Sequence, residues 1–183
     1  MDQETELEKP TEELYAALGF VVFQFGLLTE VVELAISMHF DHSDDVRVLT
    51  TGLRFPELVD RFRVLYKDFE HEGVPARGVD ELCQVLTALN TERNREIRST
   101  WGYWAHNNAP ARSRTRLGKQ GLNHSIDSVS IESLRTLGTR MESAADKVYE
   151  VAVDAMRHRK SPKLMIVTRG ENGLEYRPAS EAG

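Results

Sequence analysis

The segment EELYAALGFVVFQFGLLTEVVELAISM (residues 12–38) decides how this chain folds. Its apolar side chains recur at steps of three and four from Leu14 to Met38, which is the spacing of one face of an α-helix. Thr11, followed by two glutamates, predicts the helix start, because a threonine hydroxyl caps the first turn and acidic groups favour that end. The central stretch GFVVFQFGLL is apolar nearly all round, so it must be covered on several sides. We expect a second subunit to supply part of this cover.

Three further segments have the same helical periodicity. They cover about residues 56–70, 79–101 and 131–160, and Ser130 is placed to cap the last of them. Four helices whose connections are mostly shorter than the helices predict an all-α, antiparallel four-helix bundle over residues 11–160.

The segments outside the predicted helices contain turn residues and polar residues. The stretch SRTRLGKQGLNHSIDSV predicts a short β-hairpin before the last helix, with its turn at residues 118–121. Residues 1–10 are acidic and predict a flexible tail. Residues 161–183 form a C-terminal extension that is either a short strand pair or a mobile tail. The chain is therefore expected to be one helical domain with small additions.

The composition excludes several classes of protein. The chain has 183 residues, 40% of them hydrophobic, which is enough for a core. The single cysteine, Cys83, excludes an intrachain disulfide, and the six histidines match no zinc-binding spacing. The longest apolar stretch, Ala16 to Leu28, is shorter than the about 18 residues that cross a bilayer. We expect a cytoplasmic protein with no membrane contact, no metal and no cofactor.

Charge is distributed unevenly along the chain. The net charge is −6, and residues 1–45 hold eleven acidic residues against one lysine. Residues 92–119 hold seven basic residues against two glutamates. One concentrated basic segment in an acidic protein is typical of a surface that meets an anion. The alternative is that an acidic part of the same chain, or of a second subunit, neutralises it.

The segment TERNREIRSTWGYW (residues 91–104) places charged residues at the end of a core helix. Arg93 lies on the apolar stripe, and an arginine is rarely buried unless it is paired. Glu30 or Glu33 of the first helix is a candidate partner for it. Asn94 and Arg98 are four residues apart and share another face of the helix.

The order Arg93-Asn94, three residues, Arg98-Ser, one residue, Trp101 resembles the Arg-Asn-x-x-x-His signature of the HEPN family. The resemblance covers about residues 12–158. It implies a four-helix bundle from prokaryotic toxin–antitoxin or antiphage systems, and a metal-independent endoribonuclease site built across a homodimer. It also implies an antitoxin or a nucleotidyltransferase as partner.

The chain departs from this signature at the catalytic base. Arg98 stands where the family has histidine, and a guanidinium stays protonated, so it cannot accept the proton of a 2′-hydroxyl. We therefore expect a non-catalytic HEPN-like module that binds RNA, phosphate or a protein. In this interpretation Arg93 organises the cleft, Asn94 supports it by hydrogen bonds, and Arg98 contacts the anion.

Two alternatives stay open. In the first, the protein is an active metal-independent endoribonuclease toxin that uses Arg93 and a histidine outside the motif, such as His106 or His124. In the second, it is a purely structural dimerisation module in which Arg93 pairs with a carboxylate.

A second basic set lies in and near the predicted hairpin. Alternate residues of a strand share one face, so Arg112, Arg114 and Arg116 are expected to point to one side. Together with Arg95 and Lys119 they suit the backbone of RNA, where positive charge supplies affinity that is independent of sequence. The alternative is that they form a solvated face of the hairpin.

Overall fold

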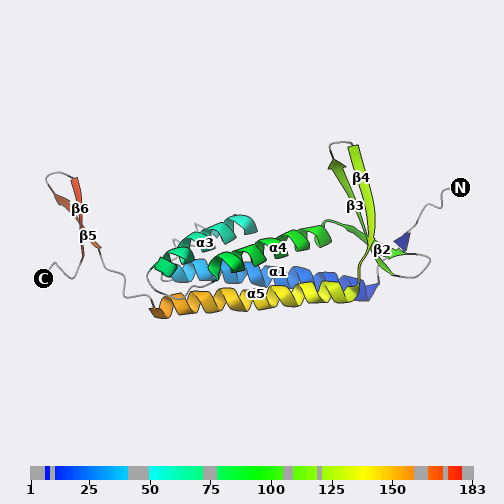
Figure 1. Ribbon diagram of the computed structural model, residues 1–183, viewed down its shortest axis with the longest axis horizontal. Helices are drawn as coiled ribbons and strands as arrows, with labels where there is room; N and C mark the ends of the chain where they lie inside the picture. The colour runs from blue at the N-terminus through cyan, green and yellow to red at the C-terminus, as the bar shows by residue number, and fades with distance from the viewer. Residues whose placement is uncertain are drawn as a thin grey trace.

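The protein is mostly helical, with a small sheet at one end, in the computed structural model of Figure 1. Its described residues are 7–8, 11–40, 50–71, 78–104, 109–118, 121–158, 165–170 and 173–178. The four helices are α1 (Glu12–His39), α3 (Phe55–His71), α4 (Val79–Ile97) and α5 (Ile131–His158). This confirms the predicted mainly helical fold.

Thr11 and Ser130 start helices as the sequence predicts. The Thr11 hydroxyl accepts a hydrogen bond from the backbone N–H of Leu14 at 3.4 Å, and the Ser130 hydroxyl accepts one from the N–H of Ser133 at 3.0 Å. Such caps satisfy N–H groups that have no partner inside the helix. Both starts lie at the same end of the bundle, next to the sheet (Figure 1).

The core is formed by one apolar stripe from each helix. Its largest fully buried side chains are Leu14, Val21, Leu28, Val32 and Ile36 of α1, Leu58, Phe62 and Tyr66 of α3, Leu86 and Leu89 of α4, and Leu134 and Met141 of α5. Each contributes about 1.5–3 kcal/mol by leaving water. Gly138 of α5 has no Cβ, and this lets α5 approach α1 closely. A Cβ at this position would overlap the ring of Phe20.

Contacts between helices fix their directions. Glu13 pairs with Arg135, which joins the first turns of α1 and α5, so these helices run the same way. Arg140 near the start of α5 pairs with Glu92 near the end of α4, so α4 runs against them (Figure 1).

Helix α3 repeats the direction of α1. Its first residue, Phe55, packs on Phe25 in the middle of α1, and Tyr66 donates to the carbonyl of Ala35 nearer the α1 end. The prediction of a wholly antiparallel bundle is therefore wrong for α1, α3 and α5. It holds for α4 alone. Helix α3 runs in the same direction as α1 because it starts beside the middle of α1 rather than at its end.

Helix α4 ends at Ile97, four residues before the predicted end at Trp101. Residues Thr100–Trp104 form strand β2, consistent with the strand preference of β-branched and aromatic residues. The Trp101 indole Nε1 donates to the carbonyl of Glu96 at 2.8 Å, so it satisfies an acceptor that the helix end leaves open.

The sheet has the strand order β1-β2-β3-β4 and is antiparallel throughout. Strand β3 (Pro110–Gly118) and strand β4 (Gly121–Ser128) confirm the predicted hairpin, with Gly118 opposite Gly121. Gly121 has a φ of 111°, which favours glycine. The hairpin projects beyond the helices (Figure 1).

Both ends of the chain contain short strands. Strand β1 (Leu7–Glu8) pairs with Tyr103 and Trp104, so part of the predicted flexible tail belongs to the sheet. In the C-terminal extension, β5 (Met165–Gly170) pairs with β6 (Gly173–Pro178), which is the strand alternative of the prediction.

Helix α1 is only partly covered by the rest of the chain. Phe23 is 62% exposed, and four further large apolar side chains of this helix are also exposed. They are Tyr15, Val22, Leu27 and Leu34. Among the described residues, α1 has the length and hydropathy to cross a bilayer, although 39% of its most apolar window is buried in the protein. The count of uninterrupted apolar residues missed this because Thr29, Glu30 and Glu33 lie within the helix.

Candidate functional site at the end of helix α4

The last two turns of α4 direct their charged side chains toward different neighbours. Arg93 lies against α1, whereas Glu92 pairs with α5 and Glu96 with β3. A helix advances about 100° per residue, so adjacent residues face different partners. The motif that looked like one site in the sequence is therefore divided between two surfaces.

On the first surface, Arg93 is held by an aromatic ring and an amide. Its guanidinium carbon Cζ lies 4.5 Å from the ring centroid of Phe25, which in turn packs on Phe55 at 4.8 Å. Such a cation–π contact contributes about 0.5–1 kcal/mol. Arg93 Nη1 donates to Asn94 Oδ1 at 2.9 Å, and Asn94 Nδ2 donates to Asn90 Oδ1 at 3.2 Å.

Arg93 has no carboxylate partner among the described residues. Its Nε is buried and makes no hydrogen bond there. Burial lowers the pKa of Arg93, and the positive charge of Arg98 lowers it further. Neither Glu30 nor Glu33 pairs with it, so the alternative of a structural salt bridge to the first helix is not formed among the described residues.

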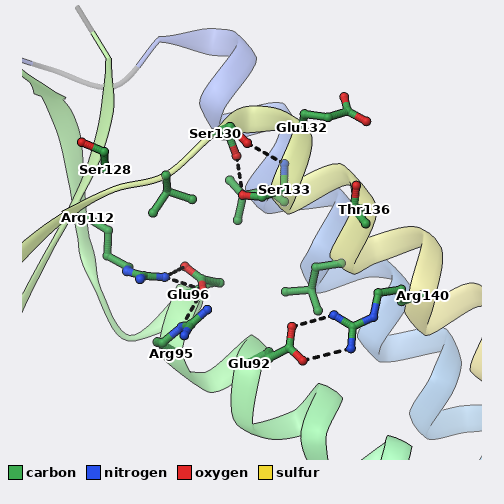
Figure 2. Close-up of a pocket in the computed structure, with 13 residues that line it drawn as sticks. Glu92, Arg95, Glu96, Arg112, Ser128, Ser130, Glu132, Ser133, Thr136 and Arg140 are labelled. Carbon is green, nitrogen blue, oxygen red and sulfur yellow. Dashed lines mark hydrogen bonds and ion pairs between the residues drawn. The ribbon is translucent and has the colours of Figure 1, made fainter.

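On the second surface, a cavity of about 630 Å³ lies between α4, α5 and the sheet (Figure 2). Charged and hydroxyl side chains line it, together with the apolar Val129, Leu134 and Leu137. Its acidic residues are Glu92, Glu96 and Glu132, and its basic residues are Arg95, Arg112 and Arg140. The opposite charges are equal in number, so the cavity presents no net charge.

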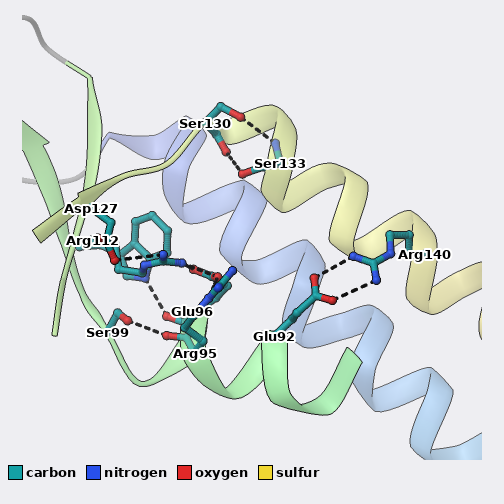
Figure 3. A network of polar contacts seen from close by, with 10 residues as sticks. Glu92, Arg95, Glu96, Ser99, Arg112, Asp127, Ser130, Ser133 and Arg140 are labelled. Carbon is teal, nitrogen blue, oxygen red and sulfur yellow. Dashed lines mark hydrogen bonds and ion pairs between the residues drawn. The ribbon is translucent and has the colours of Figure 1, made fainter. Parts of the chain in front are cut away.

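The centre of this surface is the buried carboxylate of Glu96, which is 3% exposed (Figure 3). Arg112 Nη1 donates to both of its oxygens, at 2.5 and 2.6 Å, and Arg95 Nε donates to Oε1 at 3.0 Å. Arg112 Nη2 also reaches Asp127 Oδ2 at 3.2 Å. A buried ion pair with such partners is compensated, and removing one member would leave an uncompensated charge.

At the edge of the cavity, Glu92 and Arg140 form a more exposed pair. Arg140 Nη1 and Nη2 donate to the two oxygens of Glu92 at 2.7 and 3.0 Å. This hydrogen bonding raises the pKa of Arg140. The pair joins α4 to α5 and closes one wall of the cavity (Figure 2).

The predicted site residues therefore lie on different surfaces of the protein. Arg93 and Asn94 lie together, and Arg98 is the exposed C-cap of the same helix. Arg95 lies on the second surface and pairs with Glu96. Arg112 is buried in an ion pair, which differs from the expectation that it faces an anion in solution.

The other hairpin residues are less fully described. Arg114 is partly buried and takes part in an interaction. The side chain of Arg116 and the whole of Lys119 lie outside the described residues, as does His106.

Sequence reasoning missed the partners of Arg112. A turn at Gly118–Gly121 already places Arg112 opposite Asp127, so the hairpin register contained one of them. Glu96 could not be found in this way, because its contact with Arg112 depends on how the sheet packs on α4.

The two histidines with described side-chain contacts lie away from Arg93. His39 packs on Phe40 and Tyr66, and His124 bonds to Thr115 across the hairpin. The described part of the chain contains no group of three side chains that could hold a metal ion. Comparison with protein-family models, curated proteins and solved structures finds no match to this chain.

Proposed function

We propose that this protein is a non-catalytic, HEPN-like module that binds the phosphate backbone of RNA through Arg93 and Arg98 as a cytoplasmic homodimer. The observation that carries the proposal is the half-buried guanidinium of Arg93, which has no carboxylate partner among the described residues. This guanidinium suits an anion that comes from outside the chain.

The environment of Arg93 favours binding of a ligand over a purely structural role for this side chain. Arg93 is half-buried, and a charge that is partly removed from water without a compensating partner destabilises the folded state; the lowered pKa of Arg93 has the same cause. A phosphate group accepts two parallel hydrogen bonds from one guanidinium. Arg98 follows at the exposed end of the same helix and adds a second positive charge beside it.

The resemblance to HEPN proteins supports the same site. Arg93 and Asn94 match the signature and lie at the end of a helix in a four-helix protein, and this helix runs against its neighbours. Arg98 cannot accept a proton from RNA, and neither His39 nor His124 contacts Arg93. These features favour binding without cleavage. A partner antitoxin or nucleotidyltransferase belongs to this proposal.

The exposed face of α1 supports a homodimer. Large side chains such as Phe23 and Leu27 alternate there with Gly19 and Gly26, beside which a Cβ would meet nothing within 4 Å. Exposed apolar patches of this kind mark interfaces, and small residues let two helices approach closely. Phe25, on which Arg93 packs, is two positions from Phe23 and lies on a different side of α1, so the exposed face and the Arg93 site are separate surfaces of this helix.

The experiment measures binding of a fluorescent RNA oligonucleotide by anisotropy at low salt. We expect Arg93→Gln to weaken binding by about tenfold, the value of one lost charge-assisted contact. Arg135→Gln is the matched control, because Arg135 is exposed, pairs with Glu13 of α1 at 3.1 Å and makes none of the contacts of Arg93. Equal affinity for wild type and Arg93→Gln contradicts the proposal.

The same samples test the alternatives. RNA incubated with the protein without metal stays intact under the proposal. Cleavage that disappears in Arg93→Ala would establish the endoribonuclease instead. A stable dimer that binds no RNA, phosphate or protein would favour the purely structural module, for which the exposed face of α1 is the supporting observation.

A further inference from the structure

The tip of the β3–β4 hairpin exposes two leucines that have no packing role within the described chain. Leu117 is 83% exposed and Leu122 is 77% exposed, and they lie opposite each other in the hairpin register. Only one further residue pair, Gly118 and Gly121, lies between these leucines and the turn. An apolar pair at the end of a projecting ribbon (Figure 1) marks a contact with another molecule.

The chemistry behind this tip is basic and rich in hydrogen-bonding groups. Residues 113–126 contain three basic residues and no acidic residue, although the whole chain is acidic. Asn123 and Ser125 lie opposite Arg116 and Arg114 in the register, on the other face of the hairpin from Leu117 and Leu122. Basic, amide and hydroxyl side chains are those that contact the phosphates and sugars of nucleic acids. The arm is therefore complementary in charge to a polyanion.

The base of the arm is firmly attached to the helices. Arg112, in the inner part of β3, is held by Glu96 of α4 and by Asp127 of β4 (Figure 3). The Trp104 indole donates to the hydroxyl of Ser128 at 3.1 Å, at the inner end of β4. The first carboxylate behind the basic segment, Asp127, is thus engaged by Arg112.

We infer that the hairpin is an arm that lies in the groove of duplex RNA, with Leu117 and Leu122 placed as an apolar wedge against a base step. The inference rests on the proposed function, which supplies RNA as the ligand, but it uses residues other than Arg93. The minor groove of an RNA duplex is wide and shallow and displays 2′-hydroxyls. In complexes with DNA, apolar side chains such as leucine are inserted from the minor groove and unstack a base step.

A lipid bilayer is a weaker match to the same tip. The apolar part is one residue pair deep, because the next positions toward the base are Asn123 and His124. His124 is exposed and bonds to the Thr115 hydroxyl at 3.1 Å, so polar groups follow the leucines immediately. Burial of these groups in hydrocarbon would oppose insertion.

The experiment compares the full-length protein with the double variant Leu117→Thr/Leu122→Thr on a duplex RNA that carries 2-aminopurine at a central step. For the wild type we expect binding with a rise in 2-aminopurine fluorescence, which reports unstacking. The double variant should lose this rise and bind about tenfold more weakly, the value of one good contact. Val64→Thr is the matched control, because Val64 is also strongly exposed but lies on α3.

The outcomes separate this inference from the proposed function. An unchanged fluorescence rise and affinity in the double variant overturns the arm, while sensitivity of the same binding to Arg93→Gln keeps the proposed function. Absence of binding to any RNA at low salt overturns both. Binding to single-stranded RNA or duplex DNA alone, or leucine-dependent binding to vesicles of anionic lipid, overturns duplex RNA as the ligand of the arm.

Discussion

The two surfaces at the end of α4 contain similar residues in opposite states. On the sheet side, the buried Arg112 meets the carboxylate of Glu96 within 2.6 Å. On the α1 side, Arg93 meets an aromatic ring and an amide, and no carboxylate among the described residues. Compensation of charge inside the chain is what a structural arginine needs. Its absence at Arg93 separates the candidate site from the scaffold, and the four predictions below test that contrast.

The largest effect is expected for Glu96→Gln. The change removes the charge that compensates Arg112 and leaves only the partly exposed Asp127 as its ion-pair partner. We expect the free energy of unfolding to fall by about 3 kcal/mol, as for other buried pairs that lose one member. Urea unfolding measures it.

Glu132→Gln is the control for this variant, because Glu132 lines the same cavity but is exposed. It should change stability by less than about 0.5 kcal/mol. A second variant, Glu96→Leu/Arg112→Met, removes the pair as a whole and should recover most of the lost stability. A loss below about 1 kcal/mol in Glu96→Gln would mean that the pair is not the structural anchor described above.

The second prediction concerns the exposed face of α1, through which two copies of the chain are proposed to pair. Phe23→Asp places a charge in the centre of the exposed face of α1 and should weaken self-association by about 2 kcal/mol or more, as for an interface hot spot. Sedimentation velocity over a range of concentrations measures it. If the dimer persists, α1 is not the interface.

The same variant sharpens the contrast between the two surfaces. If a monomeric Phe23→Asp protein keeps the RNA affinity of the wild type, each copy binds RNA by itself. If it loses affinity, the two copies bind RNA together.

Some features of this fold could be predicted from the sequence, and others could not. The caps at Thr11 and Ser130 and the hairpin register were predictable, because each depends on residues within a few positions. The end of α4 was not, since the Trp101 indole continues the apolar periodicity while its N–H closes the helix.

The same difference between local and long-range features applies to the charged residues. That Arg93 lies on a core stripe was readable from spacing, whereas its lack of a partner was not. Nor was the pairing of Arg112 with Glu96, which are 16 residues apart and meet only through packing of the sheet on α4. The helix directions also escaped prediction, because nothing local specifies that α3 begins beside Phe25.

The third prediction concerns the uncompensated arginine. Arg93→Met should keep the free energy of unfolding within about 1 kcal/mol of the wild type, because relief of the buried charge offsets the lost cation–π contact. A cation whose pKa is lowered on folding destabilises the folded state at every pH where it is protonated in both states.

The lowered pKa of Arg93 determines how the stability difference should depend on pH. Arginine is protonated in both states between about pH 5 and 9, so the difference between Arg93→Met and wild type should not depend on pH there. Thermal unfolding at several pH values measures it. A large loss of stability in Arg93→Met would assign Arg93 to the scaffold and weaken the case for an external anion.

The smallest effect is expected for Glu92→Gln, one turn before Glu96. Both carboxylates bind an arginine through two hydrogen bonds, but the Glu92–Arg140 pair is 32% and 48% exposed at its side chains. Water and salt screen such a pair, so we expect a loss of at most about 1 kcal/mol that shrinks when sodium chloride is raised to 1 M. The loss in Glu96→Gln should persist in the same salt, because Glu96 and Arg112 are both buried. Urea unfolding at two salt concentrations compares them, and equal salt sensitivity of the two variants would show that burial does not distinguish these pairs.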